Sequence, residues 1–110
     1  QWISVIRLPD FVTEEDFRWA VEEASKKKGI DLSKAEFQSI EEGLCVQCMH
    51  IGSYDNEPAT IALMDRYLEE NGYENDFSGG RLHHEIYLSD PRKTEPEKQR
   101  TVLRHPIRRR

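Results

Sequence analysis

The most informative segment of this sequence is Leu82-His83-His84-Glu85-Ile86-Tyr87-Leu88-Ser89-Asp90-Pro91. Its alternating side chains predict a strand over residues 82–89, which ends before Pro91 because proline cannot donate to a strand ladder. One face is mostly apolar and carries Leu82, His84, Ile86 and Leu88. The other face carries His83, Glu85, Tyr87 and Ser89. We expect the apolar face to pack against helices, so that Glu85 lies on the face that points away from them.

The carboxylate of Glu85 in the middle of this strand allows two interpretations. An antiparallel sheet commonly has one solvated face, and Glu85 can simply point into water from it. Alternatively, Glu85 lies beside Tyr87 at the floor of a groove, although burying a charge is costly. The strand pattern by itself leaves both interpretations open.

The length and composition indicate one modest domain. The chain has 110 residues, of which 36% are hydrophobic and 34% are charged. This length is enough for one core and short for two. No apolar run approaches the roughly 20 residues of a membrane span, and no secretory signal is visible. These features predict a cytoplasmic protein without a membrane partner.

The charge balance argues against a general nucleic-acid binder, because the formal net charge is -5. A basic C-terminal end is the local exception. We interpret it as a solvated tail, because it lacks the interleaved aromatic residues of a nucleic-acid-binding segment. Its residues are Arg104, Arg108, Arg109 and Arg110.

The cysteines and histidines do not predict a metal site or a cofactor. Cys45 and Cys48 form a C-x-x-C pair, which is typical of zinc and redox sites. In a strand, however, an offset of three residues places the two sulfurs on opposite faces. The same alternation separates the neighbours His83 and His84. We therefore expect reduced, structural cysteines and no metal.

The remaining pattern predicts five strands and two helices. Thr13 is the expected N-cap of the first helix, which should end at Gly29. The second helix should begin at Asn56 or Glu57 and end at Gly72. The expected strands are residues 2–8, 35–41, 44–51, 82–89 and 98–107, with residues 74–81 as a flexible loop. Short connections between these elements predict an α+β fold, with a largely antiparallel sheet and both helices on one face.

Two motifs give this sequence a family resemblance. They are His84-Glu85-Ile86-Tyr87-Leu88-Ser89-Asp90-Pro91 and, upstream, His50-Ile51-Gly52-Ser53-Tyr54. Over residues 2–107 the sequence resembles the GyrI-like small-molecule-binding family, also called DNA gyrase inhibitor-like. The resemblance is closest to stand-alone bacterial members. The family also supplies drug-sensing domains of multidrug-responsive transcription regulators, but no helix-turn-helix segment for DNA binding is present in these residues.

The resemblance implies a fold of two strand–helix–strand–strand modules with the ligand in the groove between them. Residues 1–110 would then be a single GyrI-like domain that forms the C-terminal part of that fold. Residues 44–107 would be a complete module, and residues 2–8 would match the last strand of the module before it. The other wall of the groove would come from residues before Gln1 or from a second copy in a homodimer.

The candidate ligand-binding residues surround one carboxylate. They are Glu85, Tyr87, Trp2, Tyr54, Met49 and His83. Aromatic rings and a carboxylate of low exposure both attract cations, which predicts hydrophobic, cationic or electrophilic aromatic ligands. The resemblance implies the same, because the family's drug sensors use a glutamate at the position of Glu85. The alternative is that Trp2, Tyr54 and Tyr87 are ordinary aromatic residues of the sheet and core.

Two further functions remain open. A carboxylate that is half-buried against aromatic rings can deprotonate a water molecule. Some stand-alone relatives hydrolyse cyclopropanoid natural products, so the resemblance makes Glu85 a catalytic candidate, with Trp2 or Tyr87 as its aromatic partner. The third alternative is a dimerisation or interaction module, which would cover an exposed sheet face.

Overall fold

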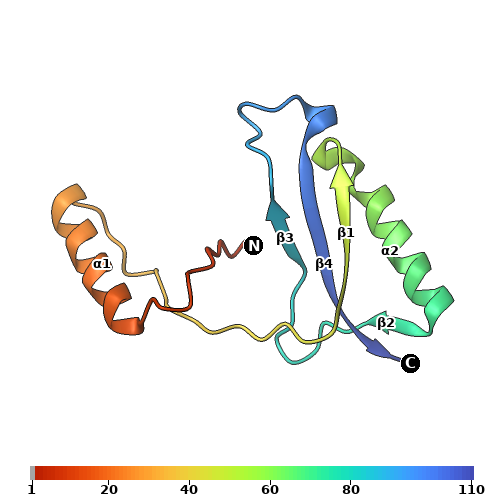
Figure 1. The fold of residues 1–110 in the computed structure, drawn as a ribbon, viewed down its shortest axis with the longest axis horizontal. Coiled ribbons are helices and arrows are strands. Elements are labelled where there is room, and N and C mark those ends of the chain that lie inside the picture. Colours follow the sequence, from red (N-terminus) through yellow and green to blue (C-terminus); the bar gives the residue numbers. More distant parts are fainter. Residues whose placement is uncertain (1) are drawn as a thin grey trace. The chain divides into compact units, whose positions relative to one another are not determined.

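The computed structural model describes residues 2–110, which divide into two compact units, Gln1–Ile40 and Glu41–Arg110 (Figure 1). Each unit is described by itself. Neither helix of the described residues is long and apolar enough to cross a membrane.

The N-terminal unit is built around helix α1, Glu14–Lys28. Its start is fixed by a capping box: the Asp16 amide donates to Thr13 Oγ1 at 3.2 Å, and the Thr13 amide donates to the Asp16 carboxylate at 2.9 Å. It ends at Gly29, whose φ of 60° is in the left-handed region that favours glycine. The predicted helix is confirmed at both ends.

The two strands predicted for this part of the chain, residues 2–8 and 35–41, are wrong. Both segments lack regular secondary structure, and Trp2, Ile6 and Ile40 are exposed. An alternating segment becomes a strand only when a second strand accepts its backbone hydrogen bonds. Within residues 2–110, neither segment has such a partner.

The C-terminal unit is a four-stranded antiparallel sheet centred on β4, Arg100–Arg109. β1, Cys45–Ile51, and β3, His84–Tyr87, pair with β4 on its two sides (Figure 1). β2, Tyr73–Asn75, pairs with the C-terminal end of β4. The predicted α+β fold is confirmed, although β3 is shorter than expected and part of the predicted loop forms β2.

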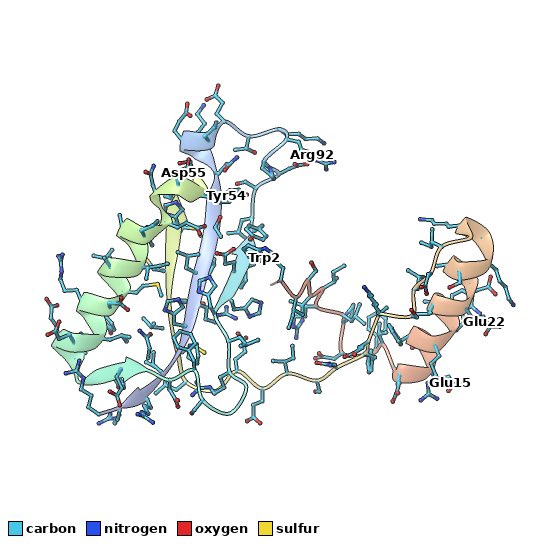
Figure 2. The ribbon with its side chains drawn as sticks, turned by 180° about the vertical axis from the view of Figure 1, so that it is seen from behind. Trp2, Glu15, Glu22, Tyr54, Asp55 and Arg92 are labelled. Atoms are coloured by element: carbon cyan, nitrogen blue, oxygen red, sulfur yellow. The ribbon has the colours of Figure 1, made fainter. Side chains whose placement is uncertain are left out.

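Helix α2, Glu57–Asn71, covers one face of this sheet and ends at Gly72 as predicted. The short turn η1, Tyr54–Asn56, leads into it, and Figure 2 shows Tyr54 and Asp55 in this turn. A second short turn, η2, Pro96–Lys98, precedes β4. The core between α2 and β4 consists of Met64, Leu68, Leu103 and Ile107.

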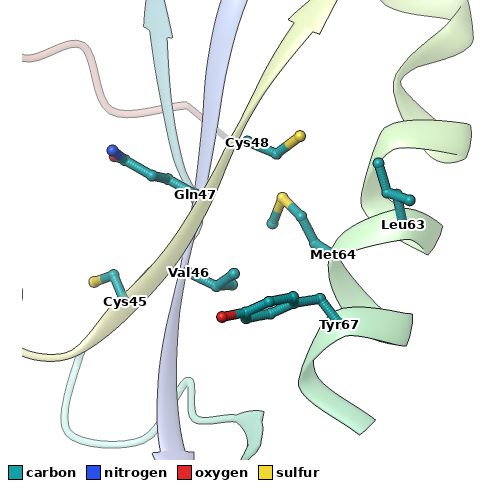
Figure 3. Close-up of a pocket in the computed structure, with 7 residues that line it drawn as sticks. All are labelled: Cys45, Val46, Gln47, Cys48, Leu63, Met64 and Tyr67. Atoms are coloured by element: carbon teal, nitrogen blue, oxygen red, sulfur yellow. The ribbon is translucent and has the colours of Figure 1, made fainter. Parts of the chain in front are cut away.

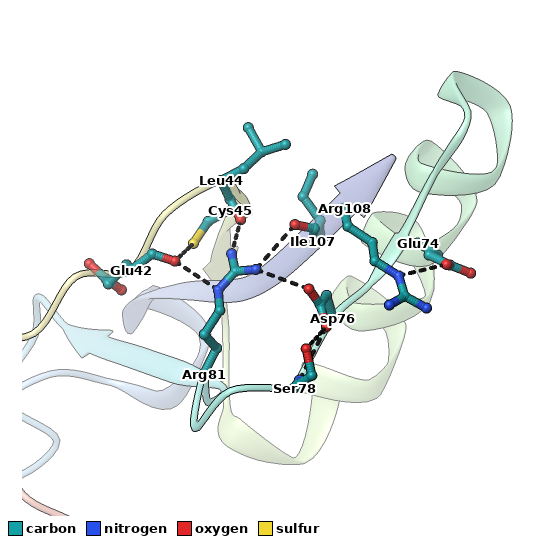
Figure 4. Close-up of polar contacts among 9 residues, drawn as sticks. All are labelled: Glu42, Leu44, Cys45, Glu74, Asp76, Ser78, Arg81, Ile107 and Arg108. Atoms are coloured by element: carbon teal, nitrogen blue, oxygen red, sulfur yellow. Dashed lines mark hydrogen bonds and ion pairs between the residues drawn. The ribbon is translucent and has the colours of Figure 1, made fainter. Parts of the chain in front are cut away.

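The basic C-terminal end is part of the sheet, so its interpretation as a solvated tail is wrong. Arg104 donates to Gln47 at 2.9 Å and to Glu42 at 2.8 Å. Arg108 donates to Glu74 of β2 at 2.8 Å (Figure 4). The Arg108–Glu74 pair thus joins opposite charges on the paired strands β4 and β2.

Arg81 links the loop between β2 and β3 to the sheet through hydrogen bonds. Its guanidinium donates to the backbone carbonyl of Glu42 at 3.1 Å, to that of Leu44, and to the Asp76 carboxylate at 3.3 Å (Figure 4). Several hydrogen bonds from one planar group hold the start of β3 in register with β1 and β4.

We predict that Leu103→Ala lowers the free energy of unfolding by about 2–5 kcal/mol, because Leu103 is fully buried and its removal leaves a cavity. Urea denaturation monitored by circular dichroism measures this change. The control is Leu63→Ala in α2, where the side chain is half exposed and the loss should stay below about 1 kcal/mol. Equal losses in the two variants would contradict this description of the core.

Candidate functional site

The side chain of Glu85 lies on the sheet face that α2 covers, and the expectation that it points away from the helices is wrong for this unit. Directly opposed residues of an antiparallel pair point to the same side. Glu85 is opposite Leu103, which is also opposite Cys48 and is buried in the α2-side core. Alternation sorts the residues of β3 into two faces, but only the register with β4 decides which face is covered.

The Glu85 carboxylate accepts hydrogen bonds from two residues of its own segment. His83 Nε2 donates to Oε1 at 3.0 Å, and the Tyr87 hydroxyl donates to Oε2. Burial opposes ionisation of Glu85, but the hydrogen bonds from Tyr87 and His83 outweigh it and lower the pKa of this carboxyl. The same bond to Glu85 raises the pKa of Tyr87 to about 12, so the phenol stays protonated as a donor.

A second carboxyl, that of Glu57 at the start of α2, lies within hydrogen-bonding reach of Glu85. Burial and then the charge of Glu85 raise the pKa of Glu57. Its Oε2 is buried and has no donor among the described residues. The pKa values of the two carboxyls are thus shifted in opposite directions, that of Glu57 upward and that of Glu85 downward.

The network around Glu85 extends to β4 through a pair of histidines. His105 Nε2 and His83 Nδ1 are 2.7 Å apart, and the ring of Phe77 packs edge-on against His105. His105 is buried, and its Nδ1 has no partner in the described part of the chain. Burial, and then the neighbouring His83, lower the pKa of His105. We call Tyr87, Glu85, His83 and His105 the Glu85 network.

The structure brings together four of the six predicted ligand-binding residues. Tyr87, His83 and Glu85 share hydrogen bonds, and the ring of Tyr54 meets that of Tyr87 edge-on with centroids 5.9 Å apart. Met49 is opposite Val102, on the sheet face that α2 does not cover, so it is not part of this group.

Trp2 belongs to the N-terminal unit, and its pairing with Glu85 stays a prediction.

Two members of the site were missed by the sequence analysis, Glu57 and His105. Glu57 was considered only as a possible start of the second helix, and His105 only as part of the strand predicted over residues 98–107. Their roles depend on which residues lie opposite them in the folded unit.

His50 on the α2 side is a packed histidine. Its two ring nitrogens lie 2.7 Å from the Thr60 hydroxyl and 2.7 Å from the Ser53 carbonyl. The carbonyl can only accept, so His50 Nε2 carries the proton and Nδ1 accepts from Thr60. These bonds join the end of β1, the turn η1 and α2, which carry Tyr54 and Glu57 of the site.

A cleft of about 360 Å³ lies between β1 and α2 (Figure 3). It is lined by Cys45, Val46, Gln47, Cys48, Leu63, Met64 and Tyr67. The side chains of Cys45 and Cys48 point to opposite sides of β1, as predicted, and neither forms a disulfide. No group of three metal-ligating side chains occurs in residues 2–110.

Comparison with protein families assigns this chain to a known class. The model of the GyrI-like small molecule binding domain matches residues 9–108. The chain therefore belongs to the GyrI-like family, as its two motifs indicate. No curated protein matches the chain significantly.

Solved structures from Listeria innocua are similar to most of the chain. An uncharacterized conserved protein is 51% identical with a TM-score of 0.89, and the match covers 93% of this chain and 50% of that protein. A protein described as a hydrolase is 50% identical with a TM-score of 0.86, covering 93% of this chain and 52% of that one. The chain thus spans about half the length of these relatives.

We predict that Glu57→Gln raises the thermal unfolding temperature, and more at about pH 8 than at about pH 5. A raised folded-state pKa means that Glu57 stabilises the fold while protonated and loses that contribution as pH rises through this pKa. Glutamine keeps a neutral donor beside Glu85 at every pH. At pH 8 the gain should be a few degrees, corresponding to about 1 kcal/mol.

Differential scanning calorimetry at the two pH values measures this effect. Glu97→Gln is the matched control, because Glu97 is exposed in η2 and away from Glu85. A gain that is independent of pH, or larger at the lower pH, would contradict a raised pKa of Glu57.

Proposed function

We propose that this domain binds hydrophobic, cationic or electrophilic aromatic small molecules, with the Glu85 carboxylate as the charged group of the site. Membership of the GyrI-like family supports small-molecule binding in general. The class of ligand is inferred from the chemistry of the side chains around Glu85.

The observation that carries this proposal is a carboxylate that stays ionised although its side chain is only 15% exposed. A charge of low exposure interacts more strongly with a cation than a fully solvated charge does.

The aromatic rings beside Glu85 are the reason for proposing an aromatic ligand. Tyr54 is 41% exposed and Tyr87 is 54% exposed, and their rings meet at an edge. Ring faces that are partly open can cover an aromatic ligand and attract its positive charge. The remaining walls of the groove would come from further chain or from a second copy.

Isothermal titration calorimetry with tetraphenylphosphonium tests this proposal, with neutral triphenylphosphine oxide as the uncharged comparison. We expect the wild type to prefer the cation, and we expect Glu85→Gln to weaken cation binding by at least tenfold, or ~1.4 kcal/mol. Binding of the neutral compound should change little, because it does not use the charge.

Glu97→Gln again serves as the matched control, since it removes one exposed carboxylate and should leave binding unchanged. Equal affinity of wild type and Glu85→Gln for the cation would contradict the role of Glu85. No binding of either compound to the wild type would contradict the proposed ligand class.

Hydrolysis of a strained, electrophilic ring is the second candidate function. Two findings favour it: the opposite directions in which the pKa values of Glu85 and Glu57 are shifted, and the description of a 50%-identical relative as a hydrolase. Glu85 would take a proton from water while the water oxygen bonds to a carbon of a cyclopropane conjugated to a carbonyl. The ring bond breaks, its electron pair passes to the carbonyl oxygen, and Glu57 supplies the proton there.

Mass spectrometry of the protein mixed with such a cyclopropanoid compound tests turnover. The hydrolase predicts a product heavier by one water, formed by the wild type and reduced by at least about 100-fold in Glu85→Gln. Binding without this product would assign the domain to sensing or sequestration.

A further inference from the structure

We propose that His105 is a positioning residue that fixes the tautomer of His83 and, through His83, the orientation of the Glu85 carboxylate. This inference deepens the proposed function, because it names what holds the charged group of that site in place. His105 would act through His83 and would not touch the ligand.

The proposal starts from an unbroken series of hydrogen bonds. The Tyr87 hydroxyl donates to one oxygen of Glu85, and His83 Nε2 lies 3.0 Å from the other. His83 Nδ1 in turn lies 2.7 Å from His105 Nε2. The series therefore runs from β3 into the central strand β4.

The Glu85 carboxylate at the end of this hydrogen-bond series determines which ring nitrogens of His83 and His105 carry protons. An ionised carboxylate accepts and cannot donate, so His83 Nε2 must carry a proton. A neutral His83 then has a bare Nδ1, which can only accept. The donor available to it is His105 Nε2, which must be protonated as well.

The opposite tautomers of His83 and His105 have a higher free energy. If His83 Nδ1 carried the proton and donated to His105, a neutral His105 would be protonated at Nδ1. That nitrogen is buried and has no partner in residues 2–110. A buried N–H without an acceptor is rarer and more costly than an acceptor without a donor. The surroundings of His105 thus select one tautomer for both rings.

His105 is itself held rigidly enough for this role. It is 6% exposed and lies opposite Val46 in the part of β4 that pairs with β1. Phe77 packs against its ring with centroids 5.4 Å apart, and His83 does so at 4.8 Å. His83, by contrast, lies outside β3 and is more exposed, so it depends on His105 for a fixed ring orientation.

The direct test is a two-bond ¹H–¹⁵N correlation spectrum of the histidine rings of the ¹⁵N-labelled full chain. We expect His83 in the wild type to be protonated at Nε2 and bare at Nδ1. His105→Gln should keep this tautomer, because the amide of glutamine can replace the Nε2–H donor. His105→Leu should give a mixture of both tautomers at His83.

The control variant is His84→Gln. His84 is the chain neighbour of His83 but bonds Glu42 at 2.8 Å on the other sheet face, so the tautomer of His83 should not change. A His83 protonated at Nδ1 in the wild type would overturn the proposal even if His105→Leu did not fold. An unchanged His83 tautomer in a folded His105→Leu protein would overturn it as well.

Tetraphenylphosphonium titrations of the same variants link the tautomer to binding. Loss of the fixed His83 donor should weaken binding at least fivefold in His105→Leu, as expected for one hydrogen bond to a charged group, and less than about twofold in His105→Gln. Equal weakening in both variants would overturn the positioning role. Absence of binding to the wild type would overturn the proposed function alone, and the spectra would still decide the role of His105.

Discussion

The register of β4 with its two neighbours is the constraint on which the site depends. Leu103 is opposite both Cys48 and Glu85, and it is fully buried beneath α2. Because the side chains of a sheet alternate, this one pairing places Glu85 on the α2 side. A shift of one residue between β3 and β4 would move its carboxylate to the other face, away from Glu57 and His105.

Burial, hydrogen bonds and neighbouring charges together set the pKa values of the carboxyls on the face that α2 covers. Burial alone would favour a neutral Glu85, but donors from Tyr87 and His83 keep its charge. Burial and the neighbouring charge of Glu85 raise the pKa of Glu57. The pair therefore combines a stronger and a weaker carboxylic acid, an arrangement that serves either the binding of a cation or acid–base chemistry.

The sequence predicted the local features of the fold because they depend on local chemistry. The N-cap at Thr13, the glycine stops at Gly29 and Gly72, and the strand before Gly52 each require only neighbouring residues. The N-terminal strands were predicted wrongly because alternation does not reveal whether a pairing strand exists.

The sequence also named Glu85, Tyr87 and His83 correctly as neighbours, but it could not show which sheet face α2 covers. For the same reason it could not join Glu57 and His105 to them, since these contacts connect residues distant in the chain.

Glu85 and Glu57 form a carboxyl pair whose pKa values are shifted in opposite directions. The most direct measurement is the pH titration of side-chain carboxyl ¹³C shifts in glutamate-labelled protein, assigned with Glu85→Gln and Glu57→Gln. We predict two coupled steps, one below and one above the ordinary glutamate value of about 4.3. The upper step should disappear in Glu57→Gln. Two independent titrations near the ordinary value would contradict the pair and the charged site built on it.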